Sequence, residues 1–236
     1  MAACRLSMDT EHLRFFFGHM AMAITAMVLL FSIFRYRNFN VFDWQMWAFL
    51  FYGLITDTIA RLSFSFPPRA YFVINVFNLF ESLFFLLFAR QFVQSEKLKK
   101  LLVILAALSL LAWTWFQFNP IDGVTIHLKM HPTFGSIYCI LSTFLYAYLL
   151  LRLIESRTNV FRQSTFWYVL GIFFSSFTAY LMQALISDEV HNRIWFLNGI
   201  FNSLTSFLFL IGFLQVRRGS HKIVGKDLVS RQGANG

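Results

Sequence analysis

The chain has 236 residues and a formal net charge of +9, with 58% hydrophobic and only 13% charged residues. A soluble protein carries about 25% charged residues, so this chain has too few charges to cover a water-facing surface. The composition excludes a soluble globular domain and predicts that lipid surrounds much of the protein. The basic residues fall between apolar runs, where membrane orientation explains them, and this distribution argues against nucleic-acid binding.

Seven apolar runs are long enough to cross a bilayer, which takes about 20 residues each. They lie near residues 15–34, 44–65, 70–92, 98–118, 133–154, 165–186 and 194–215. Proline-containing pairs mark several of their ends, for example Pro67-Pro68 and Asn119-Pro120. We expect an all-α bundle of seven transmembrane helices over residues 1–216, followed by a short basic tail over residues 217–236.

The distribution of Lys and Arg predicts the orientation of the bundle. With the N-terminus outside, 14 of the 20 Lys and Arg residues fall in cytoplasmic segments and six fall outside. Cytoplasmic segments of membrane proteins are enriched in basic residues, so the bias favours an outer N-terminus and a cytoplasmic C-terminus. The expected location is the bacterial inner membrane, with lipid as the surrounding medium.

The third and seventh runs share a sequence pattern. Five of the ten positions in 77–86 match those in 201–210, and both runs carry another Asn about one turn earlier. This match suggests two three-helix repeats of the same orientation, joined by the fourth helix. Parallel repeats of this kind are common in transporters.

Polar residues inside the predicted helices are the strongest functional signal, because burying an ionisable group in a membrane costs at least about 2.5 kcal/mol. Counting 1.5 Å per residue places several of them at neighbouring depths in the outer half of the bundle. We predict a ligand-binding cluster made of Asp57, Arg61, Asn75, Asn78, Glu81, Asn198 and Asn202. Asp57 and Arg61 are four residues apart, so they share a helix face and are expected to pair.

Three interpretations of this cluster remain open. Its members can cross-link the helices by hydrogen bonds, which is a structural role. Alternatively, they line a cavity that is open to the outside, since carboxylates within the membrane are rarely retained for packing alone. A third possibility is an ion or proton path through Glu81.

No other pattern points firmly to chemistry. His127 and His131 have the spacing of zinc ligands, but the adjoining Pro132 and Asp122-Gly123 favour a loop, so we expect no stoichiometric metal. The chain has no Gly-x-Ser-x-Gly, no His-Glu-x-x-His and no phosphate-binding glycine loop. We therefore expect no catalytic residues and no cofactor, and an enzyme is the least favoured class.

The pattern Asn75-x-x-Asn78-x-x-Glu81, the pair Phe166-Trp167, and the two Asn of the seventh run resemble those of a group of bacterial seven-helix membrane proteins. They are also similar to the seven-helix membrane modules at the N-terminus of some bacterial sensor kinases. The resemblance implies a membrane module for sensing or interaction, here without a kinase or other output domain. We expect a non-enzymatic sensor or adaptor that binds a small ligand and acts through a protein partner or a second copy. The alternative is a small-molecule or ion transporter or channel built from the two repeats.

Overall fold

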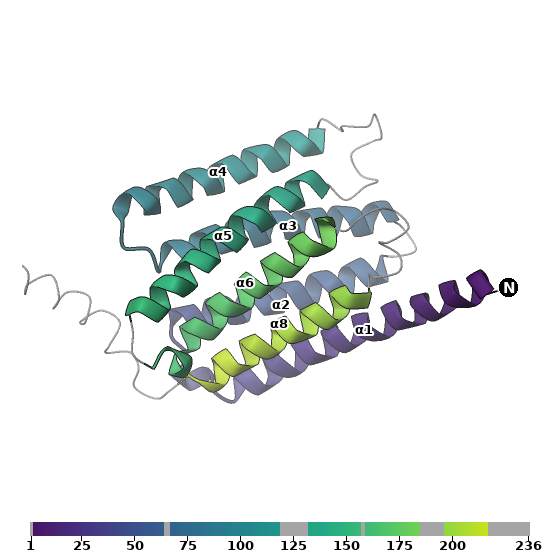
Figure 1. The fold of residues 1–236 in the computed structure, drawn as a ribbon, viewed down its shortest axis with the longest axis horizontal. Helices are drawn as coiled ribbons and strands as arrows, with labels where there is room; N and C mark the ends of the chain where they lie inside the picture. The colour runs from purple at the N-terminus through teal and green to yellow at the C-terminus, as the bar shows by residue number, and fades with distance from the viewer. Residues whose placement is uncertain (1, 64–66, 119–131, 157–158, 185–195, 217–236) are drawn as a thin grey trace, which may run out of the picture.

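The computed structural model describes residues 2–63, 67–118, 132–156, 159–184 and 196–216 (Figure 1). This part of the chain is all-α, with seven α-helices and two short 3-10 turns. They are α1 (Ala2–Ile33), η1 (Tyr36–Asn38), α2 (Val41–Leu62), α3 (Pro67–Arg90), α4 (Glu96–Phe118), α5 (Pro132–Ser156), η2 (Val160–Arg162), α6 (Ser164–Ala184) and α8 (Phe196–Leu214). The predicted all-α bundle is confirmed.

Six of these helices are long and apolar enough to cross a membrane, as expected of a multi-pass membrane protein. Within the described residues, α2 does not meet this measure of apolarity. It has 22 residues, but polar side chains such as Asp43, Asp57 and Arg61 lower its mean hydropathy. The exception matters because two of these three residues belong to the predicted ligand-binding cluster.

The predicted runs agree with the helices to within three residues at each end, apart from the first. Helix α1 begins at Ala2, well before the apolar run at residue 15, and Figure 1 shows it projecting beyond its neighbours. Its apolar span is Phe15–Ile33, so the helix continues past the apolar segment. The predicted tail over residues 217–236 lies outside the described residues.

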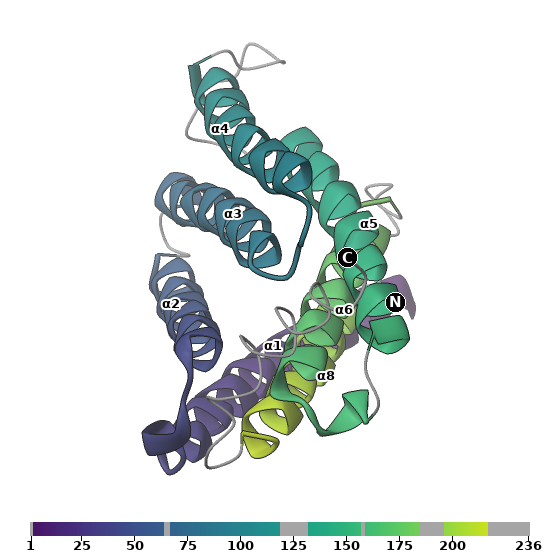
Figure 2. The same ribbon diagram turned by 90° about the vertical axis from the view of Figure 1, so that its left-hand side faces the viewer.

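The helices alternate in direction along the bundle (Figure 1). Helices α1, α3, α5 and α8 all begin at one end of the bundle, which we call the N-terminal end. They all finish at the opposite end, which we call the C-terminal end. Six helices form a closed ring of neighbours in the order α1, α2, α3, α5, α6 and α8 (Figure 2). Helix α4 packs outside this ring against α3 and α5.

Aromatic side chains fill the C-terminal half of the ring. Met46, Phe85, Tyr146 and Tyr168 come from four different helices, and each is at most 1% exposed. The Tyr146 hydroxyl donates a hydrogen bond to the Phe85 carbonyl oxygen at 2.8 Å, so even this buried polar group is satisfied. The C-terminal half is therefore closed by close packing.

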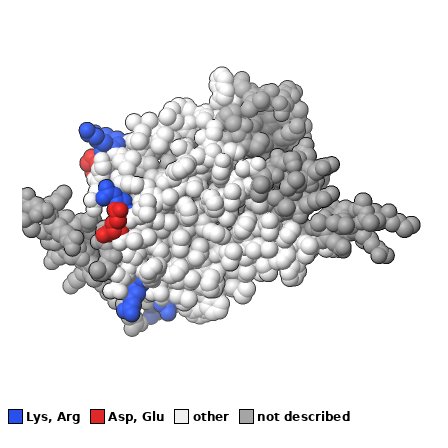
Figure 3. All heavy atoms as spheres, in the orientation of Figure 1, with Lys and Arg blue, Asp and Glu red and all other residues white. Residues whose placement is uncertain are grey.

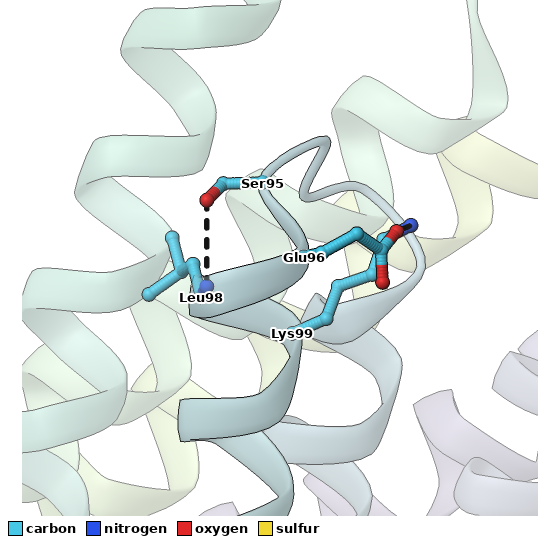
Figure 4. A network of polar contacts seen from close by, with 4 residues as sticks. All are labelled: Ser95, Glu96, Leu98 and Lys99. Carbon is cyan, nitrogen blue, oxygen red and sulfur yellow. Dashed lines mark hydrogen bonds and ion pairs between the residues drawn. The ribbon is translucent and has the colours of Figure 1, made fainter.

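Charged side chains gather at the C-terminal end, while the middle of the visible face is free of them (Figure 3). At the start of α4, the Ser95 hydroxyl accepts a weak hydrogen bond from the Leu98 amide at 3.5 Å (Figure 4). Next to it, Lys99 Nζ lies 2.7 Å from Glu96 Oε1, the sole ion pair within the described part of the chain. This distribution is typical of a helix bundle whose middle faces lipid and whose end faces water.

Candidate functional site

Glu81 is the one carboxylate of α3 and lies near the middle of this helix. Its Oε2 accepts a short hydrogen bond from the Tyr138 hydroxyl of α5. Tyr138 and its neighbour Cys139 are buried in a small cluster with Phe134, against which Trp113 of α4 packs. Glu81 therefore sits where three helices meet, and a tyrosine hydroxyl donates to its carboxylate.

Asn75 lies on α3 toward the N-terminal end from Glu81 and is only 3% exposed. Its backbone carbonyl accepts a hydrogen bond from Trp113 Nε1 at 2.9 Å. This bond attaches α4 to the outside of the ring at the depth of the site. Asn78, between the two, is half-buried. No side-chain hydrogen bond of Asn78 is seen within the described residues.

Asp57 on α2 has exposed surface, yet protein surrounds its carboxylate closely enough to desolvate it. Its charge interacts with those of Arg61 and Glu81. Asp57 and Glu81, on neighbouring helices, thus belong to one electrostatic group.

Arg61 does not form the expected ion pair with Asp57, because no nitrogen of Arg61 lies within 4.0 Å of that carboxylate among the described atoms. Its guanidinium instead lies against Gly18 of α1. A Cβ atom at Gly18 would come within 2.6 Å of Arg61 Nη2, so the absence of a side chain there makes room for the guanidinium. Arg61 thus connects α2 with α1 while remaining an electrostatic neighbour of Asp57.

Asn198 and Asn202 lie on α8, where Asn198 is half-buried and Asn202 is exposed. Their spacing puts them on the helix face that continues through Thr205 and Phe209. Thr205 is 7% exposed, and its Oγ1 has no hydrogen-bond partner among the described residues. No hydrogen bond joins either Asn to Glu81 or Asp57 in the described part of the chain. The structure therefore links Asp57, Arg61 and Glu81 electrostatically, and leaves the α8 residues unconnected to them by hydrogen bonds.

A second buried carboxylate, Asp43, was missed by the sequence analysis. It is 0% exposed at the start of α2, where its Oδ2 accepts the Asn40 amide at 2.9 Å and Asn40 Oδ1 accepts the Asp43 amide at 3.0 Å. This reciprocal arrangement is a capping box. The pattern Asn40-x-x-Asp43 before an apolar run was the signal that could have revealed it.

The Asp43 carboxylate also binds across the ring. Its Oδ1 accepts a hydrogen bond from the Tyr168 hydroxyl of α6 at 2.8 Å, and both side chains are fully buried. The Tyr168 ring fits against Gly212 of α8, where an added Cβ would lie 2.4 Å from Tyr168 Cε1. Asp43 therefore fixes three helices at the C-terminal end, far along α2 from Asp57.

The described histidines are not placed to form a metal site. His12 and His19 of α1 are exposed, and the His19 Nδ1–H donates to the Phe15 carbonyl at 2.8 Å. Among the described residues, no group of three or more His, Cys, Asp or Glu is placed to hold a metal ion. The weak zinc candidates, His127 and His131, lie outside the described residues.

Comparison with protein-family models, curated proteins and solved structures found no match to this chain.

Proposed function

We propose that the protein is a non-enzymatic sensor or adaptor of the bacterial inner membrane. It spans the membrane seven times, binds a small ligand in the N-terminal half of the ring, and acts through a partner protein or a second copy of itself. The N-terminal end of the bundle lies outside and the C-terminal end lies in the cytoplasm. The observation that carries the proposal is the Glu81 carboxylate, held by Tyr138 inside the bundle with Asp57 as its electrostatic neighbour.

Helix geometry supports the seven spans. Helix α2 runs alongside α1 and α3, both of which contain apolar spans, and its 22 residues cover about 33 Å at 1.5 Å per residue. That length matches the hydrocarbon thickness of a bilayer, which is about 30 Å. Two of its three charged residues, Asp43 and Arg61, contact other helices, which is the usual arrangement of charged groups in a membrane helix.

The position of the basic residues supports the orientation. By their positions along the described helices and turns, eight basic residues lie toward the C-terminal end, and Arg5, Arg14, Arg61 and Arg69 lie toward the N-terminal end. These eight are Arg35, Arg37, Arg90, Lys97, Lys99, Lys100, Arg152 and Arg162. An excess of this kind marks the cytoplasmic face.

The contrast between the two halves of the ring supports a sensor. The C-terminal half is closed by buried aromatic side chains and by the Asp43–Tyr168 hydrogen bond. The N-terminal half holds the accessible Asp57 and the half-buried Glu81. A ligand that enters from the outer side would meet two carboxylates and one guanidinium, an arrangement that favours a small cation such as a protonated amine. Its binding would change the packing of α2 and α3, and these helices continue to the cytoplasmic end.

The test is a thermal-stability screen of the purified full chain in detergent, with ethanolamine, tetramethylammonium, Na⁺ and K⁺ as probes. We expect at least one probe to raise the unfolding temperature of the wild type, since a ligand that binds only the folded state stabilises it. Glu81→Gln should abolish that shift. The matched control is Glu155→Gln, which removes an exposed carboxylate at the other end of the bundle and should leave the shift unchanged. An equal shift in wild type and Glu81→Gln for every active probe contradicts the proposed site.

One specific observation favours a transporter as the second candidate. The turn η1 begins at Tyr36 and η2 at Val160, 124 positions later, and the ends of α3 and α8, Arg90 and Leu214, are separated by the same 124 positions. Residues at this separation also share burial. Ser82 and Ser206 are 1% and 4% exposed, and Phe85 and Phe209 are 1% and 2% exposed. These correspondences support two parallel three-helix repeats, α1–α3 and α5–α8, with α4 as the connection.

Uptake into proteoliposomes separates the two candidates. A probe that stabilises the wild type should not accumulate inside vesicles that contain the protein if the chain is a sensor. Accumulation above that of protein-free vesicles, lost in Glu81→Gln, would establish the transporter instead.

A further inference from the structure

We infer that the groove between the end of α1, the turn η1 and the start of α2 binds one anionic glycerophospholipid, with its phosphate on Arg37 and an acyl chain among the aromatic side chains. The inference rests on the proposed membrane placement and is independent of the ligand site near Glu81.

The groove has an apolar part and a polar part. The apolar part, of about 290 Å³, is lined by Ile33, Tyr36, Phe39, Trp44 and Trp47. The polar part, of about 670 Å³, shares Ile33 and Tyr36 with it and adds Phe34, Arg37 and Asn38. Two adjoining spaces, one purely apolar and one with a cationic side chain, match the two chemical halves of a lipid.

The position of the groove selects a lipid over a soluble ligand. Ile33, in the wall of both parts, is also the last residue of the apolar span Phe15–Ile33. The groove therefore lies at the edge of the hydrocarbon layer, at the C-terminal end of the bundle. At this depth the surrounding medium is lipid headgroup and glycerol backbone, and Trp and Tyr side chains are favoured.

Arg37 supplies the charge complementarity. It is exposed, its Nε donates to the Tyr36 hydroxyl at 3.3 Å, and its guanidinium carbon lies 5.9 Å from the centre of the Tyr36 ring. No carboxylate among the described residues lies within 4.0 Å of it. The remaining N–H groups of the guanidinium can bind phosphate oxygens, which is the bidentate geometry that arginine favours.

Trp47 extends the apolar wall of the groove. It is half-buried on α2 and lines the apolar part together with Trp44 of the same helix. Its Nε1 is enclosed by protein atoms, so Trp47 contributes apolar surface to the groove and no hydrogen-bond donor. Aromatic side chains of this kind offer a large apolar area against which an acyl chain can pack.

The test is native mass spectrometry of the full chain in detergent with added palmitoyl-oleoyl phosphatidylglycerol or phosphatidylcholine. We expect the wild type to retain one phosphatidylglycerol about fivefold more tightly than phosphatidylcholine, the effect of one basic group at a lipid surface. Arg37→Gln should abolish the preference, because it weakens the binding of the anionic phosphatidylglycerol more than that of the zwitterionic phosphatidylcholine. Trp47→Ala, which removes apolar surface from the groove, should weaken the binding of both lipids equally, because both carry the same acyl chains.

Arg162→Gln is the matched control. Arg162 is exposed on η2, the second 3-10 turn at the same end of the bundle, and should leave the preference unchanged. Equal retention of the two lipids by the wild type, or an equal loss in Arg162→Gln and Arg37→Gln, would overturn the inference. A wild-type dimer that persists at saturating phosphatidylglycerol and dissociates in Trp47→Ala would assign the groove to a second copy. Displacement of the lipid by millimolar glycerol phosphate would assign it to a soluble phosphate. Both of these results would also overturn the inference.

Discussion

Asp43 on α2 and Tyr168 on α6 are 125 positions apart in sequence, yet their side chains share a 2.8 Å hydrogen bond in the closed half of the ring. Both are fully buried, and the second carboxylate oxygen of Asp43 is occupied by the Asn40 amide. The bond joins two helices that are not adjacent in the ring and have few other contacts. It is therefore a polar cross-link across the interior of the bundle, near its C-terminal end.

The first prediction concerns this cross-link. Tyr168→Phe removes the hydroxyl that donates a hydrogen bond to the buried Asp43 Oδ1. We expect a loss of about 1.5–3 kcal/mol in the free energy of unfolding, the usual effect for a hydrogen bond to a charged group. Thermal or denaturant unfolding in detergent measures it. Tyr148→Phe is the control, because Tyr148 is 42% exposed and its hydroxyl accepts a hydrogen bond from the exposed Arg152, so the change should alter stability by less than about 0.5 kcal/mol. Equal losses in the two variants would show that the buried bond contributes little.

The second prediction concerns the space that Gly212 leaves for the Tyr168 ring. Gly212→Ala would bring a Cβ within 2.4 Å of Tyr168 Cε1 and displace the ring from its position beside Asp43. We expect destabilisation of about 1–3 kcal/mol, typical of overpacking in a core. At Gly53 of α2, an added Cβ meets the Phe77 ring at 3.6 Å, which is ordinary contact. Gly53→Ala should therefore be neutral or stabilising by up to about 1 kcal/mol, since Ala favours the helix. A Gly212→Ala protein as stable as Gly53→Ala would disprove the close fit.

The third prediction concerns the Glu81–Tyr138 bond between α3 and α5. Glu81→Gln and Tyr138→Phe should each lower the unfolding temperature, because each weakens the same hydrogen bond. The double variant should lose less than the sum of the two losses, with a coupling energy of at least about 0.5 kcal/mol. A double-mutant cycle of unfolding free energies in detergent measures this coupling. Strictly additive losses would show that the two side chains act independently and would remove Tyr138 from the site.

The fourth prediction concerns the orientation of the bundle. In a Cys4→Ser background, single cysteines at Ser7 or Ser187 should react with a membrane-impermeant maleimide from outside only. Cysteines at Ser156 or Ser230 should react only after the cytoplasmic side is exposed. Cys139 is 1% exposed and should not react from either side, which makes it an internal control. Labelling of Ser187→Cys from the cytoplasmic side would reverse the orientation and put Glu81 nearer the inner face.

Most of the helices were predictable because they contain a continuous apolar run, which is a local property of the sequence. The asparagine–aspartate cap of α2 is also local, and a search for capping boxes would have found Asp43. The partner of Glu81 was not predictable by counting residues along adjacent helices. Tyr138 belongs to α5, which lies beside α3 only because α4 packs outside the ring, and nothing local encodes that choice. For the same reason, the close approach of Arg61 to Gly18 could not be read from the Asp57–Arg61 spacing.

The place of α4 has a consequence for how the protein can be divided. A cut between Phe118 and Pro132 separates α1–α4 from α5–α8 without interrupting a described helix. Polar bonds cross this division at several depths, where the first-half residues Thr25, Asp43 and Glu81 meet the second-half residues Ser206, Tyr168 and Tyr138. Two separately expressed fragments should therefore recognise each other in the membrane and co-purify. Because their matching polar groups sit at fixed positions, the fragments should reassemble with a single register.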